Sequence, residues 1–232
     1  MTEYQFEQKR KQLVELLHGE GFSQSILNAF ARVKREFFVP EAFKDNAYAN
    51  DAMPAGHNQT ISQPSTIAVM LDLLELKPGL KVLEVGGGTG YVLALLREIV
   101  GEKGKVFGIE LEKALVERSK QNLEKNGSKG VEVIQGDGAK GLKEKSPFDR
   151  ILVSAACPFI PKPLFEQLKE NGICVAPVGD RGFQTMTILH KLNGKLFKKE
   201  FLENYFVFVP LRGSYIEKDY SIREKDYSIR EE

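Results

Sequence analysis

The amino-acid sequence predicts an α/β fold built on a doubly wound sheet that is mostly parallel, with an antiparallel C-terminal hairpin and N-terminal helices. Three observations predict this fold. Strand-like and helix-like segments alternate between residues 82 and 178, which is typical of a parallel sheet covered by helices. A glycine-rich turn at 86–90 joins the first strand to its helix. The dipeptide Asn193-Gly194 separates two further strand-like segments and predicts a tight hairpin turn.

The segments before the alternating region are expected to form helices and one long polar loop. Residues 5–18 and 25–35 carry apolar side chains at helical spacing. Residues 46–64 are polar and irregular, and a loop of that length is usually either functional or disordered. A helix over 65–76 then leads into the sheet.

The later elements follow in strand and helix order. Strands are expected over 82–85, 105–109, 131–135, 150–154 and 173–178. Helices are expected over 91–100, 111–126 and 162–171, and the antiparallel hairpin over 185–190 and 195–208. Ligands of such sheets bind beyond the carboxyl ends of the parallel strands, so functional residues are expected there.

Composition narrows the class of protein. The chain has 232 residues, of which 42% are hydrophobic and 28% charged, which fits one globular domain with modest additions. Its 33 basic and 32 acidic residues argue against a nucleic-acid partner. The longest uncharged stretch, 151–161, is too short to cross a bilayer, and no export signal follows the charged N-terminus. We therefore expect a cytoplasmic protein without a membrane partner.

The two cysteines point to no metal site. Cys157 and Cys174 have no metal-ligand spacing and allow at most one disulfide. We expect two buried, reduced thiols.

The glycine turn carries the first functional signal. Gly86, Gly88 and Gly90 occupy every second position after the first strand, where bare backbone can turn sharply and approach a ligand. A dinucleotide fingerprint requires a glycine three positions after the second one, and here that position is Tyr91. With Glu84 just upstream, the loop favours a ligand that lacks phosphates and carries a cationic group. The alternative is a purely structural turn.

Two further carboxylates end the next two strands. Glu110 follows the second strand, where a carboxylate can accept both hydroxyls of a ribose. Asp137 lies between Gly136 and Gly138 after the third strand, where it can accept from an adenine amino group. Either residue could instead cap a helix N-terminus. Three carboxylates at three successive strand ends nevertheless favour a nucleoside site.

This order of carboxylates and glycines resembles the class I S-adenosylmethionine-dependent methyltransferases, over roughly residues 82–178. The resemblance implies a Rossmann-like sheet, S-adenosyl-L-methionine as cofactor and S-adenosyl-L-homocysteine as product. The cofactor-binding residues that it implies are Glu84, Gly86, Gly88, Gly90, Tyr91, Glu110, Leu111, Asp137 and Gly138, and the narrower resemblance described next adds Gln59 and Thr60.

The long loop indicates a narrower family. The sequence GHNQTISQP at 56–64 is similar to the signature of the protein-L-isoaspartate O-methyltransferases. Further matches, in the family's order, are REFFVPEAF at 35–43, PFDRILVSAACPFIP at 147–161, LKENGICVAPVG at 168–179 and FVPLRG at 208–213. The chain departs from the family in having Gly-Gly-Gly-Thr-Gly at 86–90 and Asn171-Gly172 in place of a Gly-Gly pair. Neither change removes a ligand-facing carboxylate.

The narrower resemblance implies methyl transfer to the free α-carboxylate of L-isoaspartyl residues in damaged proteins and peptides. An α-carboxyl group has a pKa of about 3.3 to 3.7, so no general base is needed at pH 7. The resemblance implies that Ser62 orients this carboxylate, and the alternative is a helix cap.

Among the three histidines, only His57, inside this loop, is a candidate for substrate contact, and the alternative is that it has no such role. The implied walls of the peptide groove are Ile61, Pro64, Ala155, Ala156, Val209, Pro210 and Leu211. Pro210 and Leu211 could equally be edge-strand packing.

The expected organisation has three parts, and the last is unusual. Residues 1–64 form helices and the active-site loop, residues 65–213 form the methyltransferase domain, and residues 214–232 form a tail. In the tail the heptapeptide EKDYSIR at 217–223 recurs at 224–230. The tail is expected to be either a frayed end or an oligomerisation arm, so the chain is a monomer or a tail-mediated homo-oligomer.

Three interpretations of the whole sequence stay open. The first is the isoaspartyl methyltransferase. The second is a class I methyltransferase with another acceptor, such as a nucleic acid or a small molecule. The third is a non-enzymatic dinucleotide-binding or regulatory module, against which Tyr91 in the third-glycine position and the carboxylates argue.

Overall fold

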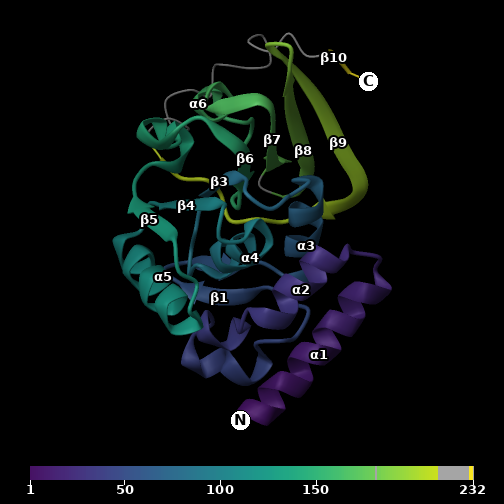
Figure 1. Cartoon of the computed structure of the whole chain (residues 1–232), viewed down its shortest axis with the longest axis vertical. Helices are drawn as coiled ribbons and strands as arrows, with labels where there is room; N and C mark the ends of the chain where they lie inside the picture. Colours follow the sequence, from purple (N-terminus) through teal and green to yellow (C-terminus); the bar gives the residue numbers. More distant parts are fainter. Residues whose placement is uncertain (181, 214–229, 232) are drawn as a thin grey trace.

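The computed structural model describes residues 1–180, 182–213 and 230–231 and contains an eight-stranded sheet with the order β10-β9-β8-β7-β6-β3-β4-β5 (Figure 1). Its strands are β3 (Lys81–Val85), β4 (Lys105–Glu110), β5 (Val131–Gln135), β6 (Phe148–Val153), β7 (Leu168–Gly179), β8 (Gln184–Leu192), β9 (Lys195–Phe206) and β10 (Arg230–Glu231). Strands β3 to β7 are parallel, whereas β8 is antiparallel to both neighbours. The predicted α/β fold with an antiparallel hairpin is confirmed.

The order of the parallel strands along the sheet reverses at β3: β4 and β5 lie on one side of it, and β6 and β7 lie on the other. This strand pairs with β4 on one side and with β6 on the other, so that Val85 lies between Ile109 and Val153. Connections leave β3 and β6 in opposite directions, and this opens a crevice beyond their carboxyl ends. The predicted ligand site lies at this crevice.

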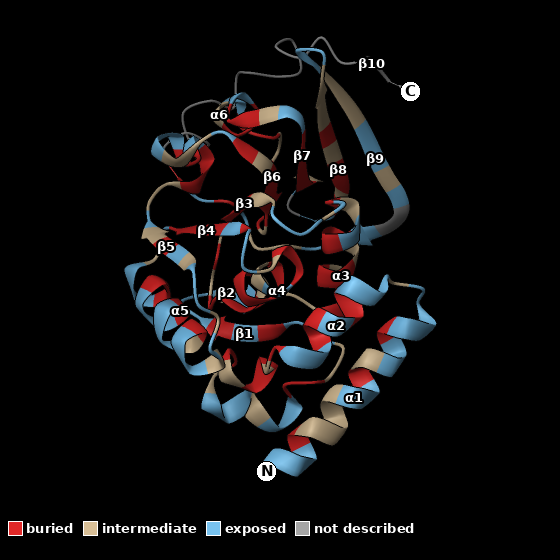
Figure 2. Cartoon of the chain, in the orientation of Figure 1, coloured by how far each residue is buried: buried red, intermediate tan, exposed pale blue. Residues whose placement is uncertain are grey.

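Helices cover both faces of the sheet. They are α1 (Glu3–Gly19), α2 (Gln24–Arg32), α3 (Pro64–Leu73), α4 (Tyr91–Val100), α5 (Lys113–Asn126) and α6 (Lys162–Glu166). Helices α1 to α5 pack with side chains such as Val82 and Leu152 on one face, and α6 packs with Leu83 and Ile151 on the other. Because both faces are covered, the central parallel strands are buried along most of their length (Figure 2).

The polar stretch 46–64 is more ordered than the sequence predicts. It contains a two-stranded hairpin of β1 (Met53–Gly56) and β2 (Gln59–Ile61). His57 and Asn58 form the turn with φ of 54° and 56°, the pair of positive values that a tight two-residue hairpin needs. Neither residue is glycine, which is why the sequence gives no clear hairpin signal. His57 is exposed at the tip.

The predicted helix over 162–171 is wrong in its second half. Helix α6 ends at Glu166, and β7 begins at Leu168, whose partner in β6 is Phe148. Asn171 has a φ of 61°, which a helix interior does not allow. Strand pairing along β7 therefore overrides the local helical pattern.

Smaller differences occur at element ends. Helix α2 ends at Arg32, so Arg35 lies in a short 3-10 helix (Arg35–Phe37). Helix α5 begins at Lys113, which leaves Leu111 in the preceding turn. Ser154 lies just beyond β6.

Cys157 and Cys174 are buried free thiols, as expected, and burial raises the pKa of Cys157 to about 12. Within the part of the chain that is described, no helix combines the length and the apolar character of a membrane span. The duplicated heptapeptide lies outside the described residues except at Arg230, where β10 pairs in parallel with β9.

Candidate active site

Two of the predicted carboxylates are held at the crevice by backbone amides. Glu110 is buried, and its two oxygens accept hydrogen bonds from the backbone N–H groups of Gly88 and Glu112, both at 2.9 Å. Asp137 accepts from the backbone N–H of Ala139 at 3.1 Å and thereby caps a short 3-10 helix (Gly138–Lys140). The capping alternative is therefore correct for one oxygen of Asp137. Both carboxylates are fixed at the carboxyl edge of the sheet, and Glu110 lines the pocket at the glycine turn.

Glu84 is the most deeply buried of the three carboxylates. One of its oxygens accepts from the Ser154 hydroxyl at 2.7 Å, and the other meets no hydrogen-bond donor among the described residues. Burial raises the pKa of Glu84 to about 8; the hydrogen bond from Ser154 lowers it and the nearby charge of Glu110 raises it. A buried carboxylate without a donor needs a partner, and a cationic group of a ligand would supply one.

The glycine turn gives the ligand access to the backbone. Gly86, Gly88 and Gly90 have φ of 84°, 51° and 91°, a region that other residues seldom adopt. Gly90 is the N-cap of α4, and a Cβ atom there would lie 2.5 Å from the Ser119 hydroxyl. The turn therefore has this conformation because its side chains are absent.

Replacing Gly90 with alanine is expected to lower the free energy of unfolding by about 1–3 kcal/mol, from backbone strain and from crowding against Ser119. Thermal unfolding measures this loss. The matched control is Gly101→Ala, because Gly101 also has a positive φ but has no other atom within 4 Å of the added Cβ. Equal losses in the two variants would show that contact with α5 plays no part.

A small pocket lies between the glycine turn and the C-terminal segment 210–212. Its volume is about 40 Å³, far below the roughly 300–1,000 Å³ typical of ligand sites. It is lined by Gln59, Gly86, Ile109, Glu110, Leu111, Gly138, Ala155, Pro210, Leu211 and Arg212. The segment is held by pairing of Pro210 with Ala156 and by an ion pair of 2.6 Å between Arg212 and Glu112. A nucleoside does not fit a space of this size, so we expect the segment to move outward when the ligand binds.

Ser62 lies between β2 and α3 and is not among the residues that line the pocket. Gln59, three positions before it, lines the pocket. The Ser62 carbonyl accepts a hydrogen bond of 3.0 Å from Arg35, whose fully buried guanidinium lies 4.7 Å from the ring centre of Tyr91. No described residue hydrogen-bonds to the Ser62 hydroxyl, which is therefore available to a substrate. Ser62 is not a helix cap, because Gln63 holds that position in α3.

Not every predicted site residue lies in the pocket. The Tyr91 ring packs against Phe30 and Phe38 in the core, so only its backbone faces the glycine turn. Ile61 and Pro64 are also buried in the core. Thr60, Ala156 and Val209 also lie outside the pocket lining, whereas Ala155, Pro210 and Leu211 belong to it.

Three residues of the site were missed from the sequence. Ser154 could have been found, since it is a polar residue directly after a parallel strand. Arg212 lies within the FVPLRG motif but on no predicted element. Arg35 resembles the other basic residues around it in sequence, so no local signal marks it as buried.

The arrangement fits a positively charged nucleoside. The partly unsatisfied Glu84 can accept from a cation, Glu110 can accept from ribose hydroxyls, and the glycine turn has no side chains that would block close approach. The Gly88 N–H of the turn is not free to bind a phosphate, because it already donates to the Glu110 carboxylate. This chemistry matches the cofactor that the sequence implies.

Comparison with known proteins gives the same answer. The family model described as protein-L-isoaspartate(D-aspartate) O-methyltransferase matches residues 8–215. Protein-L-isoaspartate O-methyltransferase 2 of Archaeoglobus fulgidus is 46% identical over 212 residues, which cover 90% of this chain and 95% of that one.

Two solved structures share the fold. A protein-L-isoaspartate O-methyltransferase superposes with a TM-score of 0.82 at 32% identity, covering 89% of this chain and 67% of that one. A Plasmodium falciparum protein assigned to the same activity, in complex with S-adenosyl-L-homocysteine, gives a TM-score of 0.77 at 26% identity, covering 88% of this chain and 98% of that one. The chain belongs to the protein-L-isoaspartate(D-aspartate) O-methyltransferase family.

Proposed function

We propose that the crevice at β3 and β6 binds S-adenosyl-L-methionine and that the chain transfers its methyl group to the free α-carboxylate of L-isoaspartyl residues in damaged proteins and peptides. Membership of the family supports the activity. The observation that carries the cofactor assignment is the buried Glu84, whose second oxygen has no donor among the described residues. We assign cofactor contacts to Gln59, Thr60, Glu84, Gly86, Gly88, Gly90, Glu110, Leu111, Asp137 and Gly138, and to the backbone of Tyr91.

The reaction needs positioning rather than a base. When bound, the cofactor supplies an electrophilic methyl group on a sulfonium sulfur. A new bond forms between the acceptor oxygen and the methyl carbon while the carbon–sulfur bond breaks, and its electron pair leaves the sulfur neutral in S-adenosyl-L-homocysteine. The acceptor carboxylate is already ionised at pH 7. The protein therefore has to align three atoms, and such alignment can supply up to roughly 7–11 kcal/mol.

Ser62 is assigned the orienting role. Its hydroxyl can donate to the acceptor carboxylate, and Arg35 fixes its backbone through the carbonyl. No described histidine hydrogen-bonds to Ser62, so no such base activates it as a nucleophile. The walls of the acceptor site are assigned to Ala155, Ala156, Val209, Pro210 and Leu211, with Ile61 and Pro64 supporting them from the core.

Ser62→Ala is expected to lower kcat for an isoaspartyl peptide about 10- to 100-fold, as for loss of one hydrogen bond to a charged group. The dissociation constant of the cofactor is expected to change little. Steady-state kinetics and calorimetry measure the two quantities. Ser146→Ala is the matched control, because the Ser146 hydroxyl donates to the Lys143 carbonyl and lies in neither the pocket nor its neighbouring segments. An unchanged kcat in Ser62→Ala would remove Ser62 from the mechanism.

The activity is tested with a pair of peptides of one sequence, one isoaspartyl and one aspartyl, and cofactor labelled in its methyl group. Base-labile methyl ester, read as released methanol, is expected from the isoaspartyl peptide alone. Equal labelling of both peptides, or of neither, would refute the proposed acceptor. Labelling of nucleic acid instead would support the alternative methyltransferase.

Three wider assignments remain proposals. We propose residues 1–64 as the substrate-delivering part, residues 65–213 as the methyltransferase domain and residues 214–232 as a tail. We propose a cytoplasmic location, which the two buried reduced thiols support. A monomer and a tail-mediated homo-oligomer differ in solution mass, so the full chain is to be compared with a chain ending at Ile216. An unchanged oligomeric state in the shortened chain would refute the hypothesis that the tail is an oligomerisation arm.

A further inference from the structure

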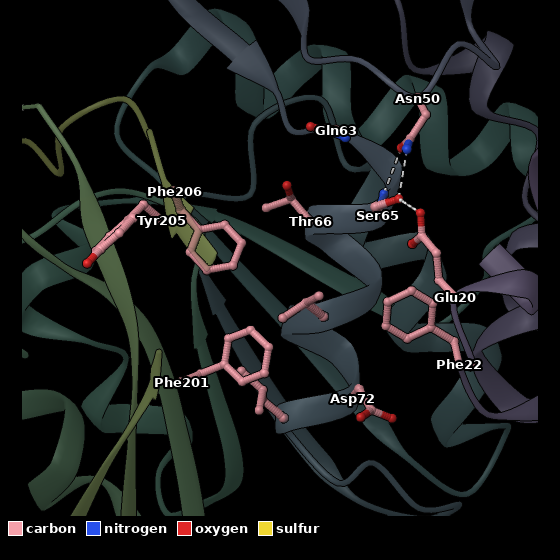
Figure 3. Close-up of a pocket in the computed structure, with 13 residues that line it drawn as sticks. Glu20, Phe22, Asn50, Gln63, Ser65, Thr66, Asp72, Phe201, Tyr205 and Phe206 are labelled. Carbon is pink, nitrogen blue, oxygen red and sulfur yellow. Dashed lines mark hydrogen bonds between the residues drawn. The ribbon is translucent and has the colours of Figure 1, made fainter. Parts of the chain in front are cut away.

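A groove of about 550 Å³ runs along α3, between β9 and the connection from α1 to α2 (Figure 3). Its volume lies within the range typical of ligand sites. In Figure 3, Phe201, Tyr205 and Phe206 lie on one side of α3, and Glu20 and Phe22 lie on the other. The pocket at the glycine turn shares none of these residues.

The groove is continuous in sequence with the proposed acceptor site. Gln63, which lines the groove, directly follows Ser62. On the opposite wall, Phe206 ends β9 at the carboxyl edge of the sheet, and three residues later the chain reaches the segment 209–211. The chain segments 59–63 and 206–212 therefore border both the groove and the pocket at the glycine turn. A polypeptide whose isoaspartyl carboxylate lies at Ser62 can continue into the groove.

The groove is acidic. Its carboxylates are Glu20 and Asp72, and none of the described residues that line it is a lysine or an arginine. One oxygen of Glu20 accepts from the Ser65 hydroxyl at 2.9 Å, and neither carboxylate has an ion-pair partner in the described part of the chain. Two carboxylates without cations favour a positively charged occupant.

The other wall is aromatic and exposed at its rim. Tyr205 is 75% exposed, and its ring lies 5.4 Å from that of Phe183, which is 58% exposed. Exposed aromatic side chains in contact with one another mark interaction surfaces. Aromatic side chains on one side of α3 and carboxylates on the other suit a segment with lysine or arginine, whose stems pack on rings while their charges meet the acids.

We propose that this groove binds the polypeptide segment that flanks the isoaspartyl residue and that Glu20 and Asp72 select a segment containing lysine or arginine. The inference rests on the proposed function and adds a charge preference to it. The acids bind the flanking segment and take no part in methyl transfer. Neutralising them therefore changes the choice of substrate and leaves turnover of an uncharged peptide intact.

The experiment uses the full chain and a set of isoaspartyl peptides in which one flanking position at a time is lysine, glutamine or glutamate. At the positions that reach the groove, kcat/KM is expected to be about tenfold higher for lysine than for glutamate, through KM. This ratio is expected to shrink as ionic strength rises. In the variant carrying Glu20→Gln and Asp72→Asn the ratio is expected to fall close to one, while the glutamine peptides keep their wild-type rate.

The control variant carries Glu102→Gln and Glu124→Gln, which remove the same charge from exposed positions away from the groove. It is expected to keep the wild-type ratio. An absent lysine preference, or one that survives in the variant with a neutral groove, would overturn the inference while leaving the methyltransferase intact. Absence of methylation of every isoaspartyl peptide would instead refute the proposed function.

Discussion

Replacing Glu84 with glutamine is expected to weaken cofactor binding by about 100-fold at pH 8–9 and, in the same pH range, to stabilise the ligand-free protein. Glutamine keeps the size of the side chain, and its oxygen can still accept from Ser154. It cannot become the anion that a cationic ligand requires. Function and stability therefore change in opposite directions.

The sign of the stability effect follows from the pKa of Glu84. Its ordinary value of 4.5 rises to about 8 in the folded chain, chiefly because of burial. Between these pH values the folded state holds a proton that the unfolded state has lost, so the free energy of unfolding falls as pH rises through this window. Full ionisation costs on the order of a few kcal/mol. The glutamine side chain in the Glu84→Gln variant does not ionise and has no such cost.

Thermal unfolding without cofactor, at pH 5 and at pH 9, tests this prediction. The unfolding temperature of Glu84→Gln is expected to exceed that of the wild type at pH 9 and to match it at pH 5. Cofactor affinity in the wild type is expected to rise with pH up to about 8, because a cationic ligand binds the ionised form. Glu102→Gln is the exposed control. Equal pH dependence in Glu84→Gln and the wild type would show that another group titrates.

Arg35→Met is expected to lower kcat for isoaspartyl peptides about 10- to 100-fold while the fold is retained. Arg35 donates to the Ser62 carbonyl at 3.0 Å, and more weakly to that of Asp51 at 3.5 Å. Its Nε and Nη1 atoms have no acceptor among the described residues, and burial lowers its pKa. An apolar side chain of similar length removes this buried charge, which often costs little stability. The variant therefore loses the hydrogen bond that holds the Ser62 carbonyl.

Steady-state kinetics, calorimetry with the cofactor and thermal unfolding separate these effects. In the Ser62→Ala background, Arg35→Met is expected to cost much less in kcat, because it acts through Ser62. Arg32→Met is the control, since Arg32 is an exposed arginine paired with Glu98. If Arg35→Met does not fold, the same measurements are made on Arg35→Lys. If Arg35→Met and Ser62→Ala lowered kcat independently of each other, the result would contradict a role for Arg35 in positioning Ser62.

The parallel sheet could be predicted because its signals are local, and the candidate ligand edge follows from the sheet. Glu84, Glu110 and the glycines each belong to or follow a strand whose apolar pattern is clear, and the carboxyl ends of parallel strands meet at one edge. Family motifs then added Ser62 and the segment 209–211. These parts of the site depend on sequence position more than on tertiary packing.

The parts that were missed depend on contacts between distant segments. Arg35 is buried only because α4 and the Ser62 segment close over it. Residues 168–179 form one long strand because β6 and β8 supply partners along it, against a locally helical pattern at its start. The acidic groove exists because Glu20 and Asp72, far apart in sequence, lie along α3 opposite the aromatic side chains of β9.

A crystal structure with S-adenosyl-L-homocysteine and an isoaspartyl peptide tests the central assignment most directly. The sulfur nucleoside is expected at the crevice of β3 and β6, with ribose hydroxyls bonded to Glu110, the segment 210–212 displaced outward and the acceptor carboxylate at the Ser62 hydroxyl. A nucleoside bound elsewhere, or an acceptor carboxylate remote from Ser62, would contradict it.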